Sequence, residues 1–183
     1  MLSNSRFGFS VAAVAALMFA TALPVPAQQE NRRKLWKNSA EYSLANSAAS
    51  DTDPAAKLAD LDKWTASYPS TDFNEQRLDL YLSAYQQLNQ ARQAFDIAQT
   101  ILLNDPNNLN ALTATLSEVA AIRPTSADLD AAEKAANYLL TNIDTVFAAS
   151  HRLSGASGEE RARTRDAVEP FVQQALQTIR GLR

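Results

Sequence analysis

Residues 78–108 read LDLYLSAYQQLNQARQAFDIAQTILLNDPNN, from Leu78 to Asn108. Apolar residues recur every three or four positions on both sides of Asn89-Gln90, and Pro106 follows the second run. This spacing predicts two amphipathic helices joined by a short turn. A helix pair of this size cannot bury its own apolar face, so it has to stack on similar neighbours. The stretch therefore predicts a helical solenoid.

Helical periodicity also runs through the residues before this stretch, and strand-like alternation does not occur there. A first helix is expected over residues 35–49, and Asp53 is expected to cap a second helix that begins at Pro54. Asp72 and Glu75 have the spacing of a capping box for the third helix. One face of the first helix would be apolar, through Trp36, Ala40, Leu44 and Ala48.

Three more helices are expected after Pro106. The fifth follows an Asn107-Asn108 cap and stops before Pro124, and Thr125 or Ser126 caps a longer sixth helix. The last helix covers residues 159–183, and Pro170 inside it predicts either a kink or a second start. Its apolar positions are Val168, Phe171, Val172, Ala175, Leu176, Ile179 and Leu182. The fold class predicted for the whole chain is all-α.

Residues 1–27 have the pattern of a secretory signal peptide. Arg6 precedes an apolar stretch over residues 7–23, and a proline-rich exit leads to Ala27, where we expect cleavage. The alternative is that residues 7–23 remain as a membrane anchor, because the stretch approaches the length that spans a bilayer. The pattern predicts export to the periplasm or cell envelope. The remaining organisation is a basic lead-in (28–35), helical repeats (36–150), a linker (151–158) and a C-terminal amphipathic helix (159–183).

The composition excludes several classes of protein. The sequence contains no cysteine, so stability has to come from packing instead of disulfides, and the attachment residue of a lipoprotein is absent. A formal net charge of −3 argues against nucleic acid as a partner. Arg32, Arg33, Lys34 and Lys37 form one basic cluster, which is either attracted to an anionic membrane surface or a solvated lead-in.

The sequence offers few candidates for catalysis or metal binding. His151 is the only histidine, and no orienting partner for a general base is identifiable near it. Asp51 with Asp53 and Asp128 with Asp130 lack the glycine and later glutamate of a calcium loop, so helix capping explains them. No glycine-rich phosphate loop, nucleophile elbow or zinc-type spacing is present. We therefore expect no enzyme, no cofactor and no metal.

Four aromatic residues have two interpretations. Trp36, Trp64, Tyr81 and Tyr85 could form a ligand-binding surface, or they could belong to the core. Their helical spacing favours the core.

The helix pair over residues 75–108 resembles a tetratricopeptide repeat. Tyr85, Ala94 and Pro106 fall at matching separations, and Leu88-Asn89 occupies the position of the family's turn. Leu78, Leu82 and Ala98 depart from the pattern, because the family has Trp, Gly and a large aromatic at these positions. The resemblance is weaker over residues 36–69 and 108–143. It implies a right-handed solenoid of about three helix pairs with a C-terminal capping helix.

The resemblance also implies a function. Members usually bind ligands on the concave face, so this chain is expected to be a non-enzymatic scaffold that binds a protein or peptide partner. The partner-binding positions implied by helix phase are Gln76, Asp79, Ser83, Gln86, Gln87, Asn110, Thr113 and Ser117. This surface is polar and almost uncharged, which fits an extended peptide better than a strongly acidic ligand.

Two alternatives to the scaffold remain open. One is a structural homo-oligomer assembled through Val168, Phe171, Val172, Leu176 and Ile179 of the C-terminal helix. The other is a truncated member of a longer tetratricopeptide protein.

Overall fold

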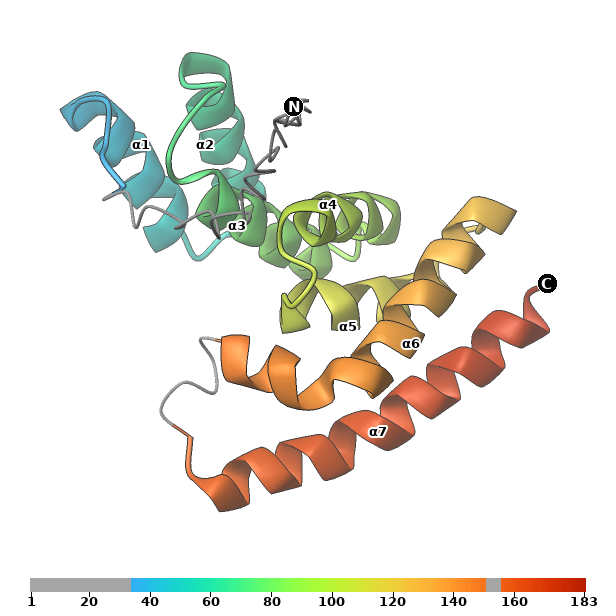
Figure 1. Ribbon diagram of the computed structural model, residues 1–183. Coiled ribbons are helices and arrows are strands. Elements are labelled where there is room, and N and C mark those ends of the chain that lie inside the picture. Colours follow the sequence, from blue (N-terminus) through green and yellow to red (C-terminus); the bar gives the residue numbers. More distant parts are fainter. Residues whose placement is uncertain (1–33, 151–155) are drawn as a thin grey trace, which may run out of the picture. The chain divides into compact units, whose positions relative to one another are not determined.

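Seven α-helices are found in residues 34–150 and 156–183, the part of the chain that the computed structural model describes (Figure 1). Within these two ranges there is no strand. The all-α prediction is therefore confirmed for them. The helices are α1 (Ser39–Ser50), α2 (Pro54–Ser67), α3 (Asn74–Gln87), α4 (Ala91–Asn104), α5 (Leu109–Glu118), α6 (Ser126–Ala149) and α7 (Gly158–Gly181).

Several sequence-based predictions fall outside the described residues. These are the signal peptide over residues 1–27, the alternative anchor over residues 7–23, the first part of the basic lead-in, His151 and most of the predicted linker. Among the helices that are described, none combines the length and apolarity needed to cross a bilayer.

Most helices begin where a short polar side chain can satisfy the first free N–H groups. Asp53 accepts a hydrogen bond from the backbone N–H of Ala55, and Pro54 occupies the first turn, as predicted. Asn108 caps α5, and Thr125 forms a complete capping box with Asp128 at the start of α6. These predicted starts are therefore confirmed. A second capping box, between Ser157 and Glu160, begins α7, so the linker ends before residue 158.

The predicted start of the first helix was wrong, and the predicted apolar face is confirmed only in part: Ala48 is buried, and Trp36 and Leu44 pack against the same cluster. The helix begins at Ser39 because Asn38 caps it by accepting the backbone N–H of Glu41. Trp36 consequently lies before the helix. The buried positions are Glu41, Ala45 and Ala48, whereas Ala40 is exposed and Leu44 is half-buried.

The predicted capping box of the third helix was also wrong. α3 begins at Asn74 without a side-chain cap. The Asp72 carboxylate instead accepts the backbone N–H of Leu35 at 3.2 Å, and Glu75 forms an ion pair with Lys34 at 2.7 Å. Both acidic groups are therefore used to hold the segment before α1 against the start of α3.

Packing follows the order of the chain, because each helix contacts chiefly the helix before it and the helix after it. The buried apolar side chains of the described ranges form three clusters. One lies around Leu61 and Trp64, one around Leu82 and Ala94, and the largest joins Phe95 of α4 to α5, α6 and α7.

Leu82 shows how α3 and α4 pack without the glycine of the tetratricopeptide pattern. The Leu82 side chain is buried in a cluster with Ala94, Ala98, Ala111 and Ala114. The large residue lies on α3 and the small residues lie on α4 and α5. The large side chain of α3 is therefore accommodated by small side chains on the two helices that it contacts.

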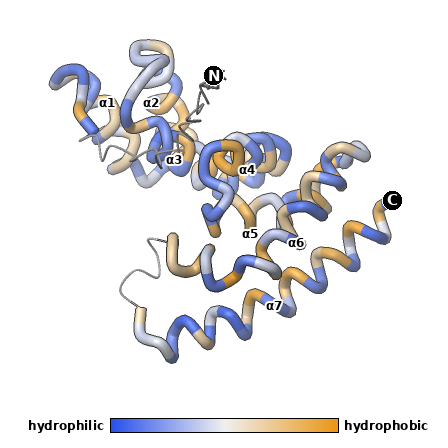
Figure 2. The backbone as a smooth tube through the Cα atoms, in the orientation of Figure 1, coloured by the Kyte–Doolittle hydropathy of each residue, from blue (hydrophilic) through white to orange (hydrophobic). Residues whose placement is uncertain are grey.

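α7 packs along α6 in the opposite direction (Figure 1). Arg183 at its end forms ion pairs with Asp130 and Glu133 near the start of α6, and Arg165 forms one with Asp144 further along α6. The helix remains continuous through Pro170, so the prediction of a second start was wrong. Short groups of polar residues and apolar residues follow one another along α7 (Figure 2), as expected for a helix with one buried face.

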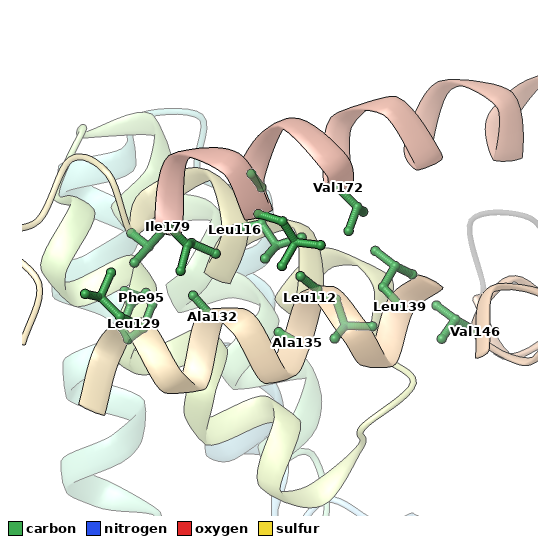
Figure 3. Close-up of a cluster of buried hydrophobic side chains, with 14 of the residues drawn as sticks. Phe95, Leu112, Leu116, Leu129, Ala132, Ala135, Leu139, Val146, Val172 and Ile179 are labelled. Carbon is green, nitrogen blue, oxygen red and sulfur yellow. The ribbon is translucent and has the colours of Figure 1, made fainter. Parts of the chain in front are cut away.

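The apolar face of α7 is buried within the chain. Val172 and Ile179 point toward Leu129, Ala132 and Leu139 of α6 (Figure 3). Leu176 belongs to the same core, and Val168 and Phe171 pack partly against it. Self-association through Val172, Leu176 and Ile179 would therefore require α7 to separate from α6, whereas Val168 and Phe171 are half-buried.

Candidate functional site

A hollow of about 530 Å³ lies between α3 and α5. Asp79, Ser83 and Gln86 line it from α3, and Asn110 and Thr113 line it from α5. These are five of the eight partner-binding residues predicted from the sequence. Leu82 also contributes to the wall. We call this hollow the amide groove.

Helix periodicity explains why these side chains meet. Residues three or four positions apart in a helix share one face, so Asp79, Ser83 and Gln86 follow one another along α3. Asn110 and Thr113 do the same on α5. On α5, the adjacent positions Ala111 and Ala114 are buried in the cluster that contains Leu82. The polar rows therefore lie on a packed apolar base.

The remaining three predicted residues lie elsewhere. Gln76 lines a second hollow, which is described below. Gln87 and Ser117 are exposed and line neither hollow. Their polar groups make local hydrogen bonds: the Gln87 amide donates to Ser83 Oγ at 3.0 Å, and Ser117 Oγ donates to the carbonyl of Ala114 at 3.2 Å.

The second hollow, of about 600 Å³, lies at the N-terminal part of α3. Its walls carry four carboxylates, from Asp72, Glu75, Asp79 and Asp105, and one ammonium group, from Lys34. Asp79 also lines the amide groove, so the two hollows share a wall. We call this second hollow the acidic hollow.

The amide groove has an almost uncharged lining, in which Asp79 is the charged residue. The acidic hollow beside it also contains Asp72, Glu75 and Asp105, which the sequence-based prediction did not include. Helix phase could not place Asp72 and Asp105 there, because both residues lie outside the helices, before α3 and after α4.

A buried polar cluster joins α1, α2 and α3, and the sequence analysis missed it. The Glu41 side chain is 0% exposed, and its carboxylate accepts the N–H of Lys37 at 2.7 Å and Nε1–H of Trp64 at 3.3 Å. Burial alone would raise the pKa of Glu41, but hydrogen bonds from Thr71, Lys37 and Trp64 outweigh it and lower the pKa.

Arg77 completes this cluster. Its guanidinium donates to the carbonyls of Tyr68 and Pro69 at 2.7 and 3.3 Å and to Asn74 Oδ1 at 2.9 Å. It also lies over the Trp64 ring, 5.4 Å from the ring centroid. Burial lowers the pKa of Arg77. All these polar groups have protein partners, so the cluster is a structural connection between three helices.

The prediction that four aromatic residues belong to the core is confirmed. Trp64 and Tyr81 are buried, and Trp36 and Tyr85 pack against the same cluster. The Trp36 ring stacks on Phe73 with 3.5 Å between centroids. Burial is the main reason that the pKa of Tyr81 is raised to about 12. These rings therefore do not form an open ligand surface.

Helix capping, which was predicted for both acidic pairs of the sequence, is confirmed for Asp53 and Asp128 but not for Asp51 and Asp130. Asp53 and Asp128 cap helices, Asp51 accepts the backbone N–H of Asp53, and Asp130 pairs with Arg183. In residues 34–150 and 156–183, no group of three or more His, Cys, Asp or Glu side chains is arranged to hold a metal ion.

No family model, curated protein or solved structure matches this chain. The resemblance to tetratricopeptide repeats therefore rests on the sequence pattern alone.

Proposed function

We propose that the chain is a non-enzymatic scaffold that binds an extended segment of a partner protein in the amide groove. The observation that supports this most directly is the convergence of Asp79, Ser83, Gln86, Asn110 and Thr113 on one hollow. Side chains held on two packed helices are positioned more precisely than side chains on loops.

The chemistry of the lining suits a peptide backbone. The amides of Gln86 and Asn110 each carry a carbonyl oxygen and an NH₂ group, so each can accept from and donate to a peptide unit. Ser83 and Thr113 add hydroxyl groups. An extended peptide advances about 3.3 Å per residue, so neighbouring turns of α3, about 5.4 Å apart, would contact different residues of the partner.

The fold that we propose for this scaffold is a solenoid of helix pairs similar to tetratricopeptide repeats. Its support is the packing of each helix on its neighbours in the chain and the sequence pattern of residues 75–108. In this arrangement α7 caps the last pair. The signal-peptide pattern of residues 1–27 supports a location in the periplasm or cell envelope.

Site-specific photo-crosslinking in cells that naturally express the full-length chain tests this function. A photo-reactive amino acid is placed at Gln86, and the adducts are identified by mass spectrometry. Gln174 is the matched control position, because it is an exposed glutamine on α7, away from both hollows. We expect one dominant protein adduct at Gln86 that is absent at Gln174.

A blocking variant shows whether the adduct depends on the amide groove. Asn110→Trp would fill this groove from the exposed face of α5 and should abolish the adduct. Circular dichroism checks that the variant remains folded. Identical adducts at Gln86 and Gln174, or an adduct that persists in folded Asn110→Trp, would contradict a partner site in the amide groove.

A further inference from the structure

We propose that the bound partner segment carries a lysine or arginine whose side chain enters the acidic hollow, and that Lys34 occupies this position in the unbound chain. This inference rests on the proposed function, because it assigns a charge preference to a peptide held in the adjoining amide groove. The structural connection between the two sites is Asp79, which lines both.

The charges of the acidic hollow favour a cation. Among the residues that the structure describes, its lining carries four carboxylates and one ammonium group, that of Lys34, so this described lining has a net negative charge. Two of the carboxylates are held in place by backbone groups: Asp72 accepts the N–H of Leu35, and Asp105 accepts the N–H of Asn107. In Asp72 and Asp105 the other carboxylate oxygen is a further hydrogen-bond acceptor.

The apolar part of the lining selects a long basic side chain. Leu78 and Ile101 contribute to the same hollow as the carboxylates. Lysine and arginine bury their methylene stems on apolar surface while the charged end reaches polar groups. A simple metal ion or a short cation would leave these two walls uncovered.

Lys34 already places an ammonium group in the hollow. Its Nζ lies 2.7 Å from Glu75 Oε2, and the two side chains are 45% and 67% exposed. An ion pair this exposed contributes little to stability, so a partner can displace it at small cost. Lys34 therefore acts as an internal competitor that lowers the affinity for weakly basic segments.

Two matched peptide pools test the charge preference by fluorescence anisotropy with the full-length chain. Both are fluorescein-labelled nonapeptides, randomised among serine, threonine, asparagine and leucine, with a central lysine in one pool and a central glutamine in the other. We expect tighter binding of the lysine pool, and a decrease of this preference at high salt.

Three variants locate the preference in the acidic hollow. Glu75→Gln and Asp105→Asn should each weaken binding of the lysine pool roughly threefold to fivefold, the scale of one exposed ion pair, and leave the glutamine pool unchanged. Lys34→Gln should strengthen binding of the lysine pool by a similar factor. The control is Glu133→Gln, which removes an acid of α6 that pairs with Arg183.

The outcomes separate this inference from the proposed function. Equal binding of the two pools, together with a groove-dependent adduct at Gln86, would overturn the charge preference and leave the scaffold intact. Failure of both pools to bind, with no specific adduct at Gln86, would overturn both. Concentration-dependent self-association that Glu75→Gln abolishes would identify a second copy as the occupant and would also overturn the inference.

Discussion

Glu41→Gln is the substitution that tests the buried polar cluster most directly. The Glu41 side chain is fully buried, and its carboxylate accepts hydrogen bonds from Lys37 N–H at 2.7 Å, from Trp64 Nε1–H at 3.3 Å and from the Thr71 side chain. Glutamine has nearly the same shape but only one acceptor oxygen. In the variant an NH₂ group therefore faces at least one of these three donors.

The expected cost follows from this mismatch. A buried donor without an acceptor costs about 1–3 kcal/mol, and hydrogen bonds to a charged acceptor lie toward the upper end. We expect Glu41→Gln to lower the free energy of unfolding by about 2 kcal/mol. For a chain of this length, about 1 kcal/mol corresponds to a change in Tm of roughly 2–4 °C, so Tm should fall by about 4–8 °C.

The effect should depend on pH. Because the pKa of Glu41 is lowered in the folded chain, its ionised form stabilises the fold above the ordinary range of a glutamate carboxyl, about 4.3. This contribution is lost as the pH falls through the lowered pKa. The difference in Tm between the parent chain and Glu41→Gln should therefore be large at pH 7 and smaller near pH 3.

Thermal unfolding followed by circular dichroism at both pH values is the measurement. Glu133→Gln is the control, since Glu133 pairs with Arg183 in a partly exposed position and should change the free energy of unfolding by less than about 1 kcal/mol. Equal Tm values for the parent and Glu41→Gln at pH 7, or a difference that persists unchanged at pH 3, would refute the role assigned to Glu41.

Three further substitutions test the packing and the turns. Ile179→Ala should cost about 2–5 kcal/mol in urea unfolding because the side chain is fully buried against α6, whereas exposed Leu182→Ala should have little effect. Ala94→Leu should cost about 1–3 kcal/mol by overpacking the cluster around Leu82, and an unchanged Tm would contradict that packing. Asn89 has a φ of 54°, so Asn89→Ala should cost about 1 kcal/mol in thermal unfolding, while Asn89→Gly should be close to neutral.

Periodicity and capping chemistry were sufficient to predict much of the fold. Asp53, Asn108 and Thr125 begin helices as expected because each has a short side chain that can accept a nearby N–H. The capping role predicted for Asp72 was wrong, since a capping-box spacing cannot show that the carboxylate binds the distant Leu35.

The candidate site was predictable where it depends on helix phase. Ser83 and Asn110 line the same groove because each lies on the predicted face of its own helix. Asp105 could not be placed in the site, because the position of a loop carboxylate depends on how two helices pack. Glu41 was missed for a related reason: a glutamate in a helix is usually exposed, and its burial depends on Trp64, which lies 23 residues away.

The serial packing of the helices has a consequence for how the chain folds. Contacts between neighbours in sequence close short loops, so the entropy lost before native contacts form is small and folding should be fast for a chain of this length. Tyr85 and Ile97 pack against two of the clusters, and Leu102 also packs against two. We therefore expect these three side chains to couple the unfolding of one cluster to that of the next. The parent chain should therefore unfold in one transition, and truncating Leu102 should let the cluster that contains α6 and α7 unfold separately from the clusters of the first helices.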